Sequence, residues 1–516
     1  LTSTFPTETI RYTINGAAPG ATSTVYTGPI TINRTTRLRA RVYNADGSAG
    51  PILSETYFRV APDLANFTSN LPIVIVDTFG RTPDNRTNSP SVWAIIEPKL
   101  RPGDPVDALP MARMTDEFHV VSRCGVKKRG SSSLGWPKYG MAIEAQGEDN
   151  RDLGIKPFGL PRESDWILSG RYRFDLALMR NPLMYRLSNE VGEYAVRTKF
   201  VEVFNNTNGG TSLSYSSDYW GVYTFMEKIK ADDDRVDRDI VERADRVEPD
   251  VTGGYLIKND RLDGDEGEVG FRVGGSNRNL AWVEPRETAL TPEQRLQVVT
   301  RPQITWLTNY MNDMYAAMIN RPNWTNTKGK HFTEYIDEDA WMKHLWLNTL
   351  SKNVDGFRLS AYFHKKNSDN GHGKLAAGPI WDFDRTMNSA NDSRSSSPSG
   401  WDGTGDSSRT FALDSRHAWW HHVLQNPDFR QAHTDLWFEM RDGPLNDRNI
   451  LDIIDEFADQ IDPRQIGESP ADRNFRRWTA NRPRNGQTNA SGFQYEVGLL
   501  KNWLRSRTRW IDSQYT

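Results

Sequence analysis

The sequence contains a single cysteine, Cys124, in 516 residues. One cysteine cannot form an internal disulfide, so a disulfide-stapled fold is excluded. No run approaches the roughly 18 apolar residues of a membrane span, so we expect none. An excess of one charge sign is also lacking, because 64 basic and 67 acidic residues leave a net charge of −3. This balance gives no general attraction to nucleic acid or anionic lipid, and we expect no nucleic-acid partner.

The residues that are present describe a globular protein. Hydrophobic residues make up 37% and charged residues 25% of the chain, which excludes a fibre or a disordered chain. A length of 516 residues exceeds what one core normally supports, so we expect at least two folded units. The many Trp and Tyr residues and the Asn- and Thr-rich surface are typical of secreted proteins and favour an extracellular or cell-surface location. The chain begins with Leu1 rather than Met, so we expect a processed product or an excised piece.

Residues 1–60 have the pattern of a small all-β module. Polar and apolar residues alternate over 9–14, and Asn15-Gly16 then gives a strong tight-turn signal. Alternation returns over 35–43. Short strands separated by Gly, Asn and Asp turns predict a β-sandwich, and residues 61–70 read as a linker.

Residues 71–516 mix strands with helices. Alternating or apolar runs predict strands at 138–144, 198–204 and 222–229. Helical spacing of apolar residues predicts a helix over 175–190, and the chain is mostly helical from about residue 288, with a helix over 337–351. The predicted fold class is therefore α+β, with an all-β module preceding a larger domain whose C-terminal part is helical.

Two aspartates carry the candidate chemistry. The segments 360–366 and 374–380 read as a strand hairpin, which would bring Asp355 and Asp382 close together. Two carboxylates at the mouth of a hairpin suit phosphoryl transfer, because Mg²⁺ prefers a few hard oxygen ligands and a second carboxylate can accept the proton of an attacking hydroxyl. The residues alone leave open that both aspartates only cap turns.

A set of ordered motifs resembles the CotH kinase family. The segment Gly378 to Asp384 (Gly-Pro-Ile-Trp-Asp-Phe-Asp) is similar to the family's signature, and it also echoes the metal-binding Asp-Phe-Gly element of ordinary protein kinases. Five further blocks follow the family's order: 128–138, 159–168, 178–181, 220–229 and 253–258. The N-terminal module resembles a chitobiase C-terminal-like domain.

The resemblance implies an atypical kinase with defined site residues. Asp355 would be the catalytic carboxylate and Asp382 the ligand of the nucleotide's metal, while Asp384 supports the metal or orients the loop. The implied cofactors are ATP and Mg²⁺. The implied reaction is transfer of a phosphoryl group to Ser or Thr of an extracytoplasmic or surface protein.

Other nucleotide contacts are predicted from position. Arg129, Ser131 and Ser132 lie in a small polar loop between two predicted strands, where backbone N–H groups could cover phosphates; an ordinary loop is the alternative. Lys138 begins the following strand and is placed like the lysine that pairs the α- and β-phosphates in kinases, with a surface lysine as the alternative.

Two further segments have candidate roles near the nucleotide. Met226 and Glu227 end an apolar strand, where backbone groups would contact adenine. Arg180 and Asn181 could contact phosphates or support the residues that do, and a purely structural role fits them equally well.

One departure from the family pattern keeps a second function open. The Asn that protein kinases place five residues after the catalytic Asp is Ser360 here, which weakens a second metal site. The alternative is a catalytically weak, CotH-like structural or binding protein of a coat, surface layer or carbohydrate-degrading assembly. Metal-dependent hydrolysis of a phosphate or sugar ester by the same aspartates is a third possibility.

Overall fold

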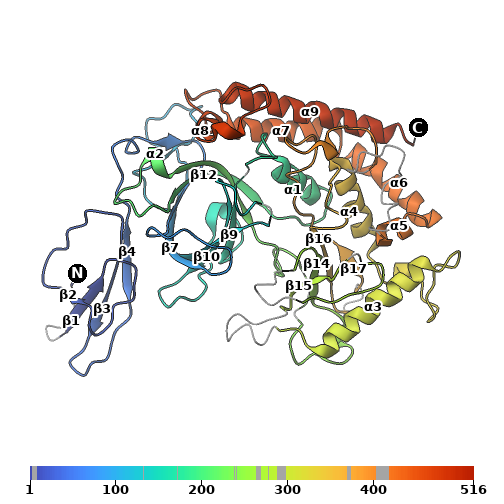
Figure 1. The fold of residues 1–516 in the computed structure, drawn as a ribbon, viewed down its shortest axis with the longest axis horizontal. Coiled ribbons are helices and arrows are strands. Elements are labelled where there is room, and N and C mark those ends of the chain that lie inside the picture. Colours follow the sequence, from blue (N-terminus) through green and yellow to red (C-terminus); the bar gives the residue numbers. More distant parts are fainter. Residues whose placement is uncertain are drawn as a thin grey trace.

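The computed structural model describes most of the chain. The described residues are 1–2, 8–131, 133–170, 172–237, 239, 241–262, 269–276, 278–286, 298–368, 373–401 and 418–515. Strands dominate the first half and helices the second, which confirms the predicted α+β class (Figure 1). No helix among these residues is long and apolar enough to cross a membrane.

The N-terminal module is one antiparallel sheet in the order β2-β1-β3-β4. Its strands are β1 (Thr9–Thr13), β2 (Thr24–Val25), β3 (Thr36–Tyr43) and β4 (Leu53–Tyr57). The predicted second sheet of a sandwich is not found among the described residues of the module. Instead, Arg37 and Arg39 of β3 reach Glu148 of the next domain, with the Arg37 Nη2–Glu148 Oε1 distance at 2.5 Å. The arginine-bearing face of β3 therefore docks against the next domain.

A closed barrel follows the module, and it lies between the N-terminal sheet and the part of the molecule that contains β14–β17 and α3 (Figure 1). Its strand order is β10-β11-β13-β12-β6-β7-β9, and only the β6–β12 pair is parallel. The strands are β6 (Ile73–Asp77), β7 (Ser89–Ile96), β9 (Val120–Arg129), β10 (Gly140–Gln146), β11 (Asp165–Ser169), β12 (Thr198–Asn206) and β13 (Tyr219–Glu227). A short pair, β5 (Thr68–Ser69) with β8 (Ala112–Arg113), lies outside it. Apolar side chains, including fully buried Trp93 and Phe225, fill one core of the barrel.

A second, antiparallel sheet lies beside the barrel, in the order β15-β14-β16-β17. Its strands are β14 (Tyr255–Asn259), β15 (Ala281–Glu284), β16 (Ala361–Lys365) and β17 (Leu375–Ala377), and α3 (Arg301–Ile319) packs nearby. The pairing of Phe363 with Ala377 and of Lys365 with Leu375 confirms the predicted hairpin. Asp355 precedes this hairpin and Asp382 follows it.

The remaining helices cover the barrel and the second sheet (Figure 1). They are α1 (Arg180–Glu190), α2 (Tyr215–Asp218), α4 (Glu338–Ser351), α5 (Ala418–Val423), α6 (Pro427–Asp442), α7 (Asp447–Ile461), α8 (Pro470–Arg477) and α9 (Ala490–Asp512). α8 packs on β13 of the barrel, where Arg473 forms a buried ion pair with Glu202 of β12 at 2.7 Å. The C-terminal end of the chain therefore completes the packing of its N-terminal half.

Two helices illustrate how local signals set element boundaries. α4 matches its prediction because Asp337 caps it, accepting a hydrogen bond from the Ala340 N–H. α1 begins at Arg180, five residues later than predicted. Leu178 has a left-handed φ of 61°, which a helix does not permit, and Asp175 accepts a hydrogen bond from the Arg180 N–H instead.

Candidate functional site

The predicted metal loop, residues 378–384, follows β17 directly. Asp382 has a φ of 65°, a left-handed conformation that Asp adopts more readily than most residues. Phe383 is fully buried in the core shared by α1 and the C-terminal helices, while Asp382 and Asp384 are half-buried. The loop is thus anchored by an apolar side chain between two carboxylates that remain accessible.

The first turns of α1 hold this loop by its backbone. The Asn181 side-chain oxygen accepts a hydrogen bond from the Phe383 N–H at 2.8 Å and another from the Tyr185 hydroxyl at 2.9 Å. The Tyr185 hydroxyl oxygen also accepts from the Asp382 N–H at 3.3 Å. Asn181 is 1% exposed, so these bonds are shielded from water. Asn181 therefore supports the metal loop.

Arg180 fixes the segment that follows the loop. Its buried guanidinium donates to the carbonyl oxygens of Thr386, Met387 and Asn388 at 3.0–3.2 Å. Asp175 balances its charge through an ion pair at 2.7 Å in which both side chains are fully buried. A buried charge is stable only when paired and hydrogen-bonded, and Arg180 meets both conditions. These contacts give Arg180 a structural role. The sequence alone had left open whether Arg180 contacts phosphates.

Asn353 joins the turn of Asp355 to the metal loop. Its side-chain oxygen accepts from the N–H groups of Asp355 and Gly356 at 3.1 and 3.2 Å, and its amide nitrogen donates to the Asp382 carbonyl at 3.4 Å. Asn353 is 5% exposed. The two aspartates singled out in the sequence therefore lie on loops that one buried amide connects.

The catalytic candidate Asp355 is partly exposed and has a basic neighbour. Arg358 donates to Asp355 Oδ1 at 2.6 Å from within the same turn. The guanidinium holds the carboxylate in a defined orientation next to the mouth of the hairpin. Sequence reasoning had assigned no role to Arg358 or to Asn353.

The carboxylates of the metal loop fit a magnesium ion. Asp384 makes no hydrogen bond or ion pair among the described residues, which leaves its oxygens available. The described residues contain no group of three or more His, Cys, Asp and Glu side chains that could enclose a metal. Mg²⁺ typically takes one or two protein carboxylates and completes its shell with water and phosphate. Asp382 and Asp384 match that donor set.

Aromatic side chains surround the start of the metal loop. The ring of Trp381 stacks on Tyr185 at 5.9 Å between centroids and meets the edge of Tyr362 at 6.3 Å. The guanidinium of Arg129 lies 5.1 Å from the Trp381 ring centre. Arg129 ends β9, so the loop of predicted phosphate contacts does approach the metal loop.

Two other predicted residues of that loop are less informative. Ser131 is exposed, and its carbonyl oxygen accepts from the Leu134 N–H at 3.5 Å. Ser132 lies outside the described residues. Their contact with phosphates stays a prediction.

Lys138 has different partners from those expected of a phosphate-binding lysine. It is 1% exposed, and its ammonium donates to the Val222 carbonyl at 2.6 Å and to Asn474 Oδ1 at 2.8 Å. The ring of Tyr223 lies 5.0 Å from the same ammonium. These contacts tie the start of β10 to β13 and α8. They give Lys138 a structural role, and its catalytic role stays a prediction.

Met226 and Glu227 lie inside the barrel wall. Met226 pairs with Ile167 of β11 and Thr198 of β12, and its side chain is buried. The Glu227 carboxylate binds Arg197 at 2.8 Å and accepts from the Tyr194 hydroxyl at 3.1 Å. Neighbouring strands flank this segment on both sides, and the Glu227 side chain is committed to the fold. Contact of their backbone with adenine stays a prediction.

The sequence did not predict the group of positively charged side chains that lies near Asp165. Lys230 and Lys228 lie 2.8 and 3.7 Å from Asp165 Oδ2. Asp165 raises the pKa of Lys228, but burial and the charges of Arg286, Lys230 and Arg129 outweigh it, so the pKa is lowered. A cluster of positively charged side chains attracts an anion. Arg129, whose charge acts on Lys228, links this group to Trp381.

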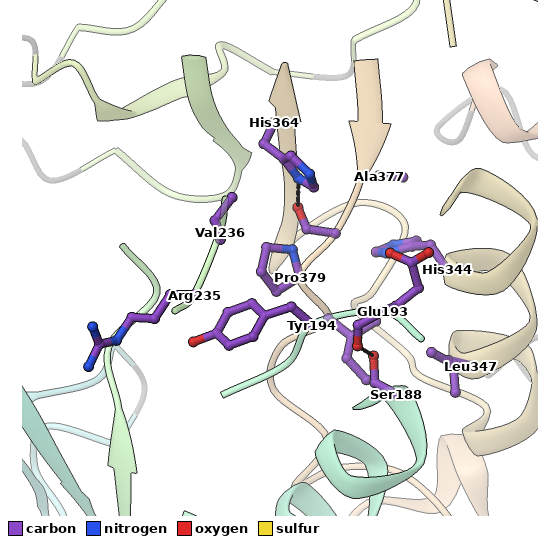
Figure 2. Close-up of a pocket in the computed structure, with 12 residues that line it drawn as sticks. Ser188, Glu193, Tyr194, Arg235, Val236, His344, Leu347, His364, Ala377 and Pro379 are labelled. Atoms are coloured by element: carbon purple, nitrogen blue, oxygen red, sulfur yellow. Dashed lines mark hydrogen bonds between the residues drawn. The ribbon is translucent and has the colours of Figure 1, made fainter. Parts of the chain in front are cut away.

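A small cavity lies behind the metal loop (Figure 2). Its volume is about 80 Å³, and Glu193, His344 and Pro379 contribute to its lining. The His364 ring and the Gly378 carbonyl, 3.3 Å apart, flank its upper side in the view (Figure 2). Ligand pockets usually measure about 300–1,000 Å³, so this cavity is too small for a nucleotide. It borders residues 378–380 and does not include Asp355 or Asp382.

Comparison with known families gives two matches. The family described as CotH kinase protein matches residues 126–511, which is well over half of the chain. The family described as Fn3 associated matches residues 1–57, the region of the N-terminal sheet. A search of curated proteins finds no match to the chain. The order of the two matched regions agrees with the expected β-module followed by a kinase-like domain.

Proposed function

Because the chain belongs to the CotH kinase family, we propose that it transfers the γ-phosphoryl group of ATP to a Ser or Thr hydroxyl of a protein. The observation that carries the proposal is the Asn353 link, which holds the turn of Asp355 against the carbonyl of Asp382. The proposed base, Asp355, and the proposed metal ligand, Asp382, are thereby held in a fixed position relative to each other. Positioning of this kind supplies most of the catalysis in phosphoryl transfer.

The proposed reaction uses the residues as follows. The acceptor hydroxyl oxygen forms a bond to the γ-phosphorus as the bond to the ADP oxygen breaks, and the hydroxyl proton passes to the Asp355 carboxylate. Asp382 and Asp384 would hold Mg²⁺, which neutralises charge on the β- and γ-phosphates when bound. Arg129 and Lys228 would face the phosphate chain, a role that the partners of Lys138 make less suitable for that lysine.

The acceptor is proposed to be an extracytoplasmic or surface protein. This part of the proposal rests on the composition and on the β-module at 1–57, which also fits attachment to a surface or polysaccharide-associated assembly. Fractionation of the producing cells tests it, and recovery of the protein only from the cytoplasm would contradict it.

Labelling with γ-labelled ATP tests the reaction. Wild-type protein, Mg²⁺ and candidate acceptors are expected to give labelled phosphoserine or phosphothreonine, whereas Asp355→Asn and Asp382→Asn give none. Asp452→Asn is the matched control, because this aspartate is largely exposed on α7 and, among the described residues, forms an ion pair only with Arg448 at 3.5 Å. Label transfer by both site variants, with all proteins folded by circular dichroism, would show the assignment to be wrong.

A second candidate function is a scaffold of a coat, surface layer or carbohydrate-degrading assembly with weak catalysis or none. The ion pair between Arg358 and Asp355 and the structural partners of Lys138 favour it. Thermal unfolding with millimolar ATP and Mg²⁺ separates the two, because a ligand that binds only the folded state raises the melting temperature. An unchanged melting temperature would favour the scaffold.

A further inference from the structure

A serine-rich segment follows the metal loop in the chain. Residues 393–399 read Ser-Arg-Ser-Ser-Ser-Pro-Ser, and we call them the serine segment. One of its serines, Ser395, is fully buried. The other serines are exposed: Ser393, Ser396, Ser397 and Ser399. Exposed hydroxyls are the groups that phosphoryl transfer to a protein requires, yet the proposed function gives this segment no role.

Two buried cations hold the serine segment by its backbone. The Lys352 ammonium donates to the carbonyl oxygens of Ser397 and Ser399 at 3.2 and 2.8 Å. The Arg507 guanidinium donates to the Pro398 carbonyl at 2.8 Å. Lys352 is 2% exposed and Arg507 is fully buried. The carbonyl groups of 397–399 therefore point to buried groups, and these contacts fix the segment without using its hydroxyls.

The exposed serine hydroxyls make few contacts within the fold. The Ser396 hydroxyl donates to the Ser393 carbonyl at 2.7 Å, and the Ser397 hydroxyl accepts from the Ser399 N–H at 3.2 Å. Both of these bonds stay within the serine segment. The hydroxyls of Ser393 and Ser399 make no hydrogen bond among the described residues. These serines can therefore be presented to a second molecule without breaking a side-chain hydrogen bond to any described residue outside the segment.

The serine segment is tied to both loops of the candidate site. Lys352 lies three residues before Asp355, at the end of α4. The Ser395 hydroxyl donates to the Arg385 carbonyl at 3.0 Å, and Arg385 follows Asp384 directly. One link thus leads to the turn of the proposed base, and the other leads to the loop of the proposed metal ligands. The segment therefore lies beside the candidate site.

We propose that the exposed serines of the serine segment are phosphorylated by a second copy of the same chain. Transfer within one molecule is disfavoured, because moving the segment into its own site would leave the buried charges of Lys352 and Arg507 without the carbonyl groups that they bind. Transfer between copies leaves these contacts in place. Because the segment and the site lie side by side, two copies that meet about a twofold axis can place each segment against the other's Asp355.

The inference rests on the proposed function for its chemistry. The serine Oγ forms a bond to the γ-phosphorus of ATP as the bond to the ADP oxygen breaks, and the serine proton passes to Asp355 of the copy that holds the ATP. The products are ADP and a phosphoserine, which adds about −1.5 to −2 charge to the segment at neutral pH.

Self-labelling of the full chain tests the proposal. Wild-type protein with γ-labelled ATP and Mg²⁺, and with no other acceptor, is expected to label itself, and peptide mass spectrometry is expected to locate the phosphate within 393–399. The label per molecule is expected to rise in proportion to the protein concentration, because two copies must meet. Label that is independent of concentration, or phosphate found only outside the segment, would overturn the proposal.

Variants of the segment test the site of modification. The combined variant Ser393→Ala, Ser396→Ala, Ser397→Ala and Ser399→Ala is expected to lose the self-label but still to label an external library of Ser- and Thr-containing peptides. Ser506→Ala is the matched control and keeps the self-label, because this serine is also exposed but lies within the regular helix α9. Self-label that persists in the combined variant would contradict the assignment.

A mixture of two chains tests transfer between copies. A size-tagged Asp355→Asn chain is expected to stay unlabelled alone and to become labelled when wild-type protein is added. Label that appears only on the wild-type copy would show transfer within one molecule and overturn the proposal.

The peptide library keeps this inference distinct from the proposed function. Label on the peptides but not on the chain would remove self-phosphorylation and leave the kinase assignment standing. Absence of label from both the peptides and the chain would remove the kinase assignment, and the inference with it.

Discussion

Asn181→Ala should loosen the metal loop by an amount that follows from two hydrogen bonds. The substitution deprives the buried Phe383 N–H and the Tyr185 hydroxyl of the acceptor that they share at 2.8 and 2.9 Å. A buried donor left without a partner costs about 1–3 kcal/mol. We therefore expect the free energy of unfolding to fall by about 2–6 kcal/mol, measured by urea titration with tryptophan fluorescence.

Hydrogen exchange localises the effect of Asn181→Ala. Faster exchange is expected over residues 378–388, because α1 holds this segment by its backbone. Tyr185→Phe is the matched control: it keeps the bond between Asn181 and Phe383, and a loss of about 1 kcal/mol is expected. Unfolding energy within about 0.5 kcal/mol of wild type, together with unchanged exchange over 378–388, would refute the reasoning.

Three further substitutions test other groups. Burial raises the pKa of Glu193 from 4.5 to about 7, so the folded state keeps a proton that the unfolded chain releases, and stability falls as pH rises from about 4.5 to 7. Between about pH 4.5 and 7 this effect amounts to about 3 kcal/mol in the free energy of unfolding, and Glu193→Gln should remove it. Urea unfolding at both pH values measures the difference. Lys138→Met should lower the free energy of unfolding by about 1–3 kcal/mol, because the Val222 carbonyl loses the ammonium and Asn474 Oδ1 keeps the Val222 N–H as a donor, while ATP affinity measured by calorimetry stays the same. A large loss of affinity in a protein of normal stability would restore the phosphate role. Ser360→Asn should raise the free energy of unfolding by about 0.5 kcal/mol, because Ser360 has a φ of 53° that Asn adopts more easily. A stability equal to or below that of the wild type would contradict this.

Local patterns predicted the elements that place the two aspartates. Alternation on either side of a turn gave the β16–β17 hairpin, and the helical spacing of apolar residues gave α4. Those signals are short-range, so neighbouring residues suffice to recognise them. The positions of Asp355 and Asp382 followed from the hairpin.

Long-range partners could not be predicted in the same way. Asn353 acts on Asp382, 29 residues later, and Lys138 binds Asn474, 336 residues later. Nothing in the sequence around either residue distinguishes a buried donor from an exposed one. The same holds for the contact between the N-terminal sheet and the next domain, in which Arg37 binds Glu148, 111 residues later.

The packing of α8 on the barrel determines the order in which the barrel can complete its folding. Glu202 and Lys138 are buried beside the barrel wall, yet their partners Arg473 and Asn474 follow them in the chain by 271 and 336 residues. Until then the barrel carries a buried carboxylate and a buried ammonium without their partners, which is costly inside a protein. We expect nascent chains that end before α8 to remain incompletely folded and dependent on chaperones, so that the barrel completes its folding only after α8 has been synthesised.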